Sequence, residues 1–410
     1  MNRLAWVFVL FLAASPAWGA RKTSIQRLRD LLVSMRQAGK TDAEVAAALE
    51  QVELTEQLNR STMKSLADCV PGPNSTEQFY VLEARSAVLA PPPADLPSTP
   101  PPDAAATKAI LDKAVDYAAR SYAQLPHLSA TRNTFRFQDS GEYLQAGSDS
   151  RSSANDSDSN LVNASRIVHF IGSIESPVEI ENGAEKIPSA KDKGKQSPVD
   201  QITLLGQSPV LSSILQEAQA AGKIEWLRWE MVNGSPAAVF SFAVDKKKSR
   251  YAVNYCCFPD IGQASDSMSY GNYGARAGVS SDPGSTQPSL GGTSIAMPTT
   301  MQVARAANWK TFKATVPYRG ELFVDPATGI VLRLVTQADF RPSDLVQREN
   351  RRIDYGPVTV GGKTLILPVK SFIDTEVIPN GYTGFGKHPI RDTLFTIDYK
   401  DYQLAGAEQK

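Results

Sequence analysis

Residues 318–334, YRGELFVDPATGIVLRL, place a cluster of turn-forming residues between two apolar runs. Asp and Pro are favoured at the start of a tight turn, and Gly allows the left-handed backbone conformation that closes it. We therefore predict a β-hairpin in which Asp325 forms the turn and is neither a ligand nor an acid. Apolar side chains occupy both faces of its strands, with Phe323 and Val331 on one face and Leu322, Val324, Ile330 and Leu332 on the other.

Other segments are apolar on both faces in the same way, including residues 236–244 (PAAVFSFAV) and 363–369 (KTLILPV). An antiparallel sheet usually leaves one face open to water, so such strands need two coverings. The helices of the chain can provide one. The second is either a further helix with loops or an apolar ligand in a hollow. The residues expected to line that hollow are Leu227, Trp229, Met231, Phe240, Phe242, Phe323, Val331 and Ile366.

The region after about Thr131 alternates apolar and polar residues and contains about eleven predicted strands. Their connections contain NG, DPATG, YGP and VGGK, which are typical of tight antiparallel turns rather than of crossover helices. One helix, residues 209–223, interrupts the strands and is predicted to end at Gly222. We therefore predict one large, curved antiparallel sheet, an unclosed or nearly closed barrel, in a protein of the α+β class.

Two strands of this sheet have contrasting polarity. Residues 391–399 (RDTLFTIDY) place Phe395, Ile397 and Tyr399 on one face and mostly polar residues on the other. Residues 348–356 (RENRRIDYG) are polar throughout, and we expect this strand to border solvent.

Residues 24–126 are predicted to be largely helical. Thr41 and Glu44 form a capping box, followed by Val45, Leu49 and Val52 on one helix face. A Pro-rich stretch, APPPADLPSTPPPD, is a semi-rigid connector. The predicted organisation is a signal peptide at 1–19, a helical region at 20–89, the connector at 90–103, and a helix-plus-sheet domain at 104–410 with mobile insertions at 147–160, 183–200 and 259–298.

The signal peptide is predicted from one positive charge, a short apolar run, and small residues at Ala17 and Gly19. The run is too short for a typical membrane span, although an uncleaved anchor is the alternative. The protein is therefore expected to be periplasmic or secreted, with no integral membrane span after signal removal. In an oxidising compartment Cys69 could bridge to Cys256 or Cys257, or it could remain a buried thiol.

Composition and motifs indicate no enzyme. The 43 basic and 43 acidic residues balance, so no global charge attracts nucleic acid or acidic lipid. Asp156 begins a segment like a calcium loop that lacks its Gly and Glu, and Ser61 with Lys64 fits an acylating S-x-x-K motif without its partner triplets. Three scattered His offer no zinc spacing. We predict no catalytic residue, no metal and no cofactor.

The hairpin at 318–334, together with GSPAAVFSFAV and IDYGPVTVGGKTLILPV, resembles a group of uncharacterised exported bacterial proteins. More loosely, a wide antiparallel sheet with a D-P-x-T-G hairpin and an L-P-V strand is similar to the LolA/LolB-like periplasmic lipoprotein carriers. That resemblance implies an unclosed barrel, lidded by helices, whose concave face holds acyl chains. The helical N-terminal region and the long insertions depart from it, and no ligand residue can be carried over.

These observations lead to two hypotheses about function. The first is an exported, non-enzymatic protein that binds a lipid or acyl chain, free or on an acylated protein, in the concave face of the sheet. The alternative is a structural or protein-interaction module of the cell envelope whose hollow is filled by its own helices. The sequence does not indicate an oligomeric state.

Overall fold

A computed structural model describes residues 21–139, 168–181, 183–186, 211–259, 309–377 and 391–405. The predicted signal peptide, the insertion at 147–160 and almost all of the insertion at 259–298 lie outside these residues. The insertion predicted at 183–200 overlaps a short strand, Ala184–Lys186, at its start. Within the described ranges, no helix is long and apolar enough to cross a membrane.

The N-terminal region contains four helices around a small core. They are α1 (Ile25–Gln37), α2 (Asp42–Glu50), α3 (Arg60–Leu66) and α4 (Pro73–Ser86). The capping box between Thr41 and Glu44 is present at the start of α2. Cys69 is a free thiol buried in this core, whereas the side chains of Cys256 and Cys257 lie outside the described part of the chain.

The helical region also contains a two-stranded parallel sheet that the sequence did not predict. It pairs β1 (Arg21–Thr23) with β2 (Val52–Leu54). Val52 was expected on α2, but α2 ends at Glu50 and Val52 begins β2. Val52 and Leu54 are buried on either side of the exposed Glu53, which is the alternation of a half-buried strand.

Two further helices belong to the sheet domain. Helix α5 (Ala104–Ala123) follows the connector, and the Asp103 carboxylate accepts a hydrogen bond of 2.7 Å from the backbone N–H of Ala106 at its start. Helix α8 (Leu211–Ala221) ends at Gly222, as predicted, where the backbone φ of 69° is left-handed.

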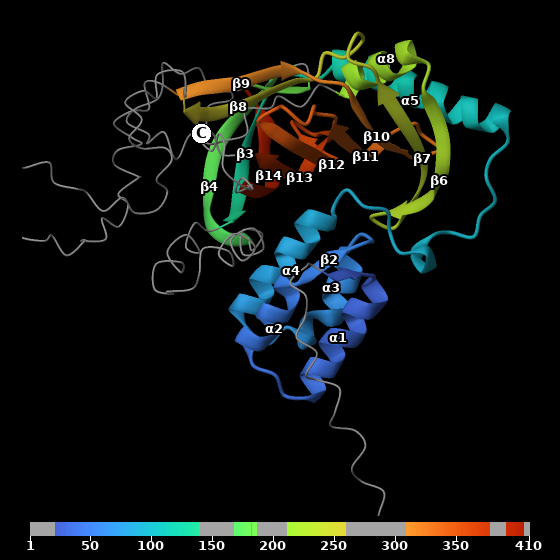
Figure 1. The fold of residues 1–410 in the computed structure, drawn as a ribbon. Coiled ribbons are helices and arrows are strands. Elements are labelled where there is room, and N and C mark those ends of the chain that lie inside the picture. The colour runs from blue at the N-terminus through green and yellow to red at the C-terminus, as the bar shows by residue number, and fades with distance from the viewer. Residues whose placement is uncertain are drawn as a thin grey trace, which may run out of the picture.

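The main sheet has ten strands in the order β5-β4-β3-β14-β13-β12-β11-β10-β7-β6, and it is unclosed, with β5 and β6 at its edges (Figure 1). All its neighbouring strands pair antiparallel. This confirms the predicted α+β class and the large antiparallel sheet. Its strands are β3 (Leu128–Asp139), β4 (Val168–Glu181), β5 (Ala184–Lys186), β6 (Ile224–Val232), β7 (Ser235–Val244), β10 (Tyr318–Val324), β11 (Val331–Ala338), β12 (Val346–Val360), β13 (Lys363–Val377) and β14 (Arg391–Leu404).

Two predicted strands are not part of this sheet. Strands β8 (Ala252–Pro259) and β9 (Trp309–Thr315) pair with each other in a separate two-stranded sheet. Turn chemistry and alternation predict that a segment is extended, but they do not determine which sheet it joins.

The hairpin at 318–334 forms as predicted, from β10, β11 and the DPATG turn. The Asp325 carboxylate accepts hydrogen bonds from the backbone N–H of Ala327 and the hydroxyl of Thr328, both at 2.8 Å, so Asp325 forms the turn. Gly329 adopts a φ of 77°, and a Cβ there would lie 2.5 Å from the carbonyl oxygen of Lys113 in α5. The glycine therefore permits both the turn and its close approach to α5.

Two face assignments in this hairpin were wrong, those of Val331 and of Leu332, which packs on the Phe323 side. Val331 was expected on the same face as Phe323, but the pairing register shifts between Phe323 and Val324. Phe323 pairs with Arg333, and Val324 pairs with Val331. The irregularity moves Val331 to the opposite face of the sheet from Phe323.

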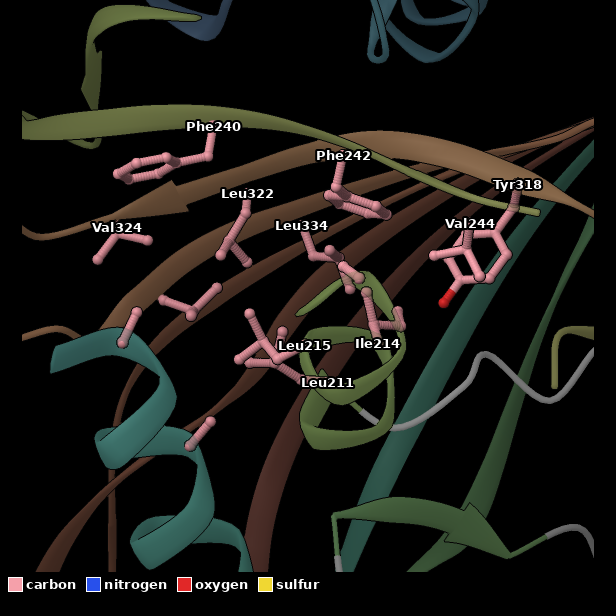
Figure 2. Packing of buried hydrophobic residues seen from close by; sticks show 14 of the residues in the cluster. Leu211, Ile214, Leu215, Phe240, Phe242, Val244, Tyr318, Leu322, Val324 and Leu334 are labelled. Carbon is pink, nitrogen blue, oxygen red and sulfur yellow. The ribbon is translucent and has the colours of Figure 1, made fainter. Parts of the chain in front are cut away.

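The two faces of the sheet have different covers. On the face that we call the α5/α8 face, the side chains of β7, β10 and β11 point toward α8 and α5 (Figure 2). The other face, which we call the α4 face, packs against the helical region, where Val81 and Ala84 of α4 contact Phe372 and Leu394. The helical region is therefore the second cover that the two-sided apolar strands required. Figure 1 shows these helices on opposite sides of the sheet.

Candidate functional site

The eight residues predicted to line a hollow do not come together in the structure. Phe240, Phe242 and Val331 are buried in the cluster between the sheet and helices α5 and α8, and Trp229 and Ile366 pack against that cluster. Phe323 lies on the α4 face, in a different cluster. Leu227 and Met231 are 44% and 47% exposed on the edge strand β6. Helix α8 occupies the space beneath β7 and β10, so this part of the sheet is a packed core.

A second part of the α5/α8 face lies on β13 and β14. Ile373, Phe395 and Ile397 are buried there, and Tyr399 packs against them. We call these three residues the β13–β14 patch. Within the described ranges, their cluster contains no side chain from a second layer, which distinguishes it from the core under α5 and α8. The apolar face of β14 was predicted correctly, but β13 was not recognised as its partner.

A row of buried polar side chains borders this patch. Glu349 of β12 pairs directly with Thr375 of β13, which pairs directly with Thr393 of β14, so all three project from the same face. Their exposed fractions are 0%, 0% and 2%. Thr375 and Thr393 lie two residues from Ile373 and Phe395, on the same face as the patch. We call Glu349, Thr375 and Thr393 the polar row.

The polar row has unused hydrogen-bonding capacity. Glu349 Oε1 accepts hydrogen bonds from the Tyr251 hydroxyl at 3.0 Å and from Arg351 at 3.2 Å. Glu349 Oε2, Thr375 Oγ1 and Thr393 Oγ1 are buried and have no hydrogen-bond partner in the described part of the chain. Leaving such a group unpaired costs roughly 1–3 kcal/mol. The row is therefore suited to a ligand group that can donate to a carboxylate and exchange hydrogen bonds with hydroxyls.

Burial also affects the tyrosine that contacts this row. Desolvation raises the pKa of Tyr251 well above its ordinary value, and the neighbouring Glu349 carboxylate raises it further. Tyr251 therefore stays protonated at physiological pH, and its hydroxyl donates a hydrogen bond to Glu349. Glu349 Oε2 is the carboxylate oxygen that remains for another donor.

A network of charged side chains lies on the α4 face. The carboxylate of Asp354 accepts hydrogen bonds from Arg333 at 2.7 Å and from Arg352 at 2.7 and 3.0 Å. Glu230 accepts from Arg228 at 2.8 and 3.0 Å, and from Arg333 at 3.3 Å. Of these residues, Arg352 and Asp354 belong to the β12 segment that was expected to border solvent, but Asp354 is 7% exposed. That prediction was wrong, because alternating opposite charges pair with other strands as readily as with water.

The network makes the stability of the protein dependent on acid pH. Burial alone would raise the pKa of Asp354, but Arg352 and Arg333 more than reverse this and lower it to about 2. A depressed folded-state pKa stabilises the fold above the unfolded pKa of about 4, and this stabilisation is lost as the pH falls toward 2. Urea unfolding between pH 4 and 2 should therefore show a loss of about 2 kcal/mol from this group.

The Asp354→Asn variant tests the assignment of this acid-dependent loss. It should make the slope between pH 4 and 2 less steep, whatever its effect on stability at neutral pH, and the rest of the slope comes from other acids with lowered pKa values, such as Glu44. Glu230 does not confuse the measurement, because burial raises its pKa and it titrates above this window. An unchanged slope in the variant would contradict the role of Asp354.

Comparison with known proteins gives weak structural resemblance. No family model and no curated protein matches the sequence. A crystal structure of a LolA superfamily protein from Nitrosomonas europaea aligns with 72% of this chain and 92% of its own, at 10% identity and a TM-score of 0.21. A MucA/MucB complex structure from Pseudomonas aeruginosa aligns with 72% of this chain and 94% of its own, at 8% identity and a TM-score of 0.19. Scores this low carry no argument about function, and the resemblance to a group of exported bacterial proteins stays a prediction.

Sequence reasoning missed the polar row entirely. Thr393 belongs to a strand that was predicted correctly, and Thr375 lies two residues beyond the end of the strand predicted at 363–373, but hydroxyls are common on either face of a strand. Glu349 was placed in a solvent-facing strand. The useful signal is the alternation itself, since Thr393 falls on the face already assigned to Phe395 and Ile397. An apolar face interrupted by one polar position indicates a buried polar group.

Proposed function

We propose that this chain is a non-enzymatic binding protein of the cell envelope that holds an amphiphilic lipid or acyl chain against the β13–β14 patch. The polar end of the ligand would lie at the polar row. The observation that carries the proposal is the buried row of Glu349, Thr375 and Thr393, whose three unpaired polar atoms border an apolar surface. The periplasmic or secreted location rests on the predicted signal peptide at 1–19.

The geometry favours a particular kind of polar end. Glu349 Oε2 is an acceptor, so the ligand group facing it needs an O–H or N–H donor. A fatty-acid carboxylate would place like charges together, whereas an acylglycerol hydroxyl or an acyl amide would donate. From the polar row to Ser371 and Ile397, the same face of β13 and β14 extends about 14 Å along the strands. An acyl chain can lie along this length.

A second candidate function has its own supporting observation. Helices α5 and α8 already fill the surface beneath β7, β10 and β11 with Leu211, Ile214 and Leu215. If the chain covers the β13–β14 patch by itself as well, the protein is a structural or protein-interaction module. This alternative requires no lipid, so uptake measurements separate the two.

The test is stoichiometric uptake of an acyl ligand. The purified chain should be extracted and analysed by lipid mass spectrometry, then titrated with a monoacylglycerol and with the corresponding fatty acid. We expect about one equivalent of the monoacylglycerol to bind, and the fatty acid to bind more weakly. No uptake of either ligand would contradict the proposal and support the self-filled module.

The Thr393→Val variant locates the site. Valine has nearly the volume of threonine and removes an unpaired hydroxyl, so the fold should keep its stability while monoacylglycerol affinity falls by about fivefold to tenfold. Thr396→Val is the matched control, because Thr396 pairs with Phe372 and projects from the α4 face of the same strand. Equal affinities in the two variants would contradict a ligand at the polar row.

A further inference from the structure

A pocket of about 490 Å³ lies between the helical region and the α4 face of the sheet. One wall is formed by the start of α3 and by α4, including Arg60 and Glu83. The opposite wall is formed by β11, β12 and β13, including Arg333 and Lys370. This volume is within the range of small-molecule sites in proteins. The pocket is on the other face of the sheet from the polar row, so it is independent of the function proposed above.

The carboxylates on the floor of this pocket are already neutralised. Asp354 is held by two arginines at hydrogen-bonding distance, and both oxygens of Glu230 accept hydrogen bonds from arginines. Arg333 uses its Nε and one terminal nitrogen in these contacts, and its other terminal nitrogen, Nη2, makes no hydrogen bond in the described part of the chain. The floor therefore offers an unused cationic donor rather than an unused acid.

Lys370 is the second unused donor. Its side chain is 12% exposed, and its Nζ lies 4.6 Å from the ring centroid of Phe372. The nearest carboxylate in the described residues is Glu83, at 3.8 Å, which is too far for a direct hydrogen bond. Burial lowers the pKa of Lys370, and the positive charges of Arg60 and Arg352 lower it further, whereas the carboxylates of Glu83 and Asp398 act in the opposite direction. A second anion beside Nζ would therefore stabilise the charged ammonium form of Lys370.

At the end of the pocket near Lys370, two cations share one carboxylate, and Asp95 is a further acid elsewhere in the lining. Glu83 is the carboxylate shared by Lys370 and by Arg60, whose Nε lies 3.6 Å away. Two cations thus face one acid, and neither makes a hydrogen bond to it. Apolar side chains, Leu58, Met231 and Phe372 among them, complete the lining. The combination fits a molecule with one anionic group and a compact apolar part.

We infer that this pocket binds a small organic anion, with a carboxylate or phosphate group between Lys370 and Arg60 and its apolar part against Phe372 and Met231. The oxygens of the anion would accept the ammonium and guanidinium hydrogen bonds that Glu83 is too distant to accept. Because the ligand touches both the helical region and the sheet, binding would also hold these two parts together.

Calorimetric titration with benzoate and phenyl phosphate at constant ionic strength tests this site, with benzamide as the uncharged control. We expect the anions to bind and to raise the unfolding temperature, and benzamide to do neither. Benzoate should also slow the reaction of Lys370 with an amine-selective reagent without protecting Lys400, which is 50% exposed beside Glu175. Equal binding of benzoate and benzamide would overturn the inference.

Variants establish which residues hold the anion. Lys370→Met should reduce benzoate affinity by about tenfold or more, the loss of a charge-assisted hydrogen bond, and Lys370→Arg should recover part of it. Lys400→Met should behave as the wild-type chain. If Lys370→Met does not fold, Arg60→Gln gives the same test, because the Arg60 side chain is 72% exposed and its loss leaves the fold intact. Unchanged benzoate affinity in Arg60→Gln, and in Lys370→Met where it folds, would show that these cations serve only to join the two parts of the protein.

Discussion

Replacing Arg333 by Met is expected to lower the free energy of unfolding by about 3–5 kcal/mol, because it leaves buried carboxylates without part of their counter-charge. Arg333 is 6% exposed and contacts Asp354 at 2.7 Å and Glu230 at 3.3 Å. Its guanidinium also lies 5.1 Å from the ring centroid of Phe323, a cation–π contact that the variant loses. Urea unfolding followed by circular dichroism at pH 7 measures the change.

The matched control for this prediction is Arg319→Met. Arg319 is on β10 of the same sheet and pairs with Asp339, but its side chain is 59% exposed. An exposed pair contributes about 0–1 kcal/mol, so this variant should unfold close to the wild-type midpoint. Similar losses of unfolding free energy in the two variants would mean that burial does not determine how much Arg333 stabilises the protein. The account of the charged network would then be wrong.

The network explains why the second cover of the sheet was difficult to predict. Local features follow from short stretches of sequence: the turn at Asp325, the capping box at Thr41 and the end of α8 at Gly222 were all predicted. The network of charged side chains on the α4 face depends on partners that are distant along the chain. Glu230 meets Arg333 across 103 residues. No local pattern distinguishes such a buried pair from a solvated one.

The same limit applies to the candidate site. The apolar alternation correctly placed Phe395 and Ile397 together on one face of β14, but the polar row depends on the register that places Glu349, Thr375 and Thr393 in line. Register in a sheet of this size is set by bulges, such as the one between Asp354 and Tyr355, and a shift of one residue reverses every face. The register shift in the hairpin is the reason that Phe323 and Val331, both predicted to line the hollow, lie on opposite faces of the sheet.

Replacing Phe240 by Ala is expected to destabilise the protein by about 3–5 kcal/mol, because it opens a cavity in the core between the sheet and helices α5 and α8. Phe240 is fully buried, pairs with Leu322 and meets the ring of Trp226 edge-on at 5.9 Å. Leu227→Ala, from the same set of predicted lining residues, removes an exposed side chain and should change stability by no more than about 0.5 kcal/mol.

Monoacylglycerol uptake per folded molecule should be the same in both variants, because the proposed ligand lies on β13 and β14. A Phe240→Ala variant that unfolds like the wild-type chain but loses uptake would instead place the ligand beneath β7.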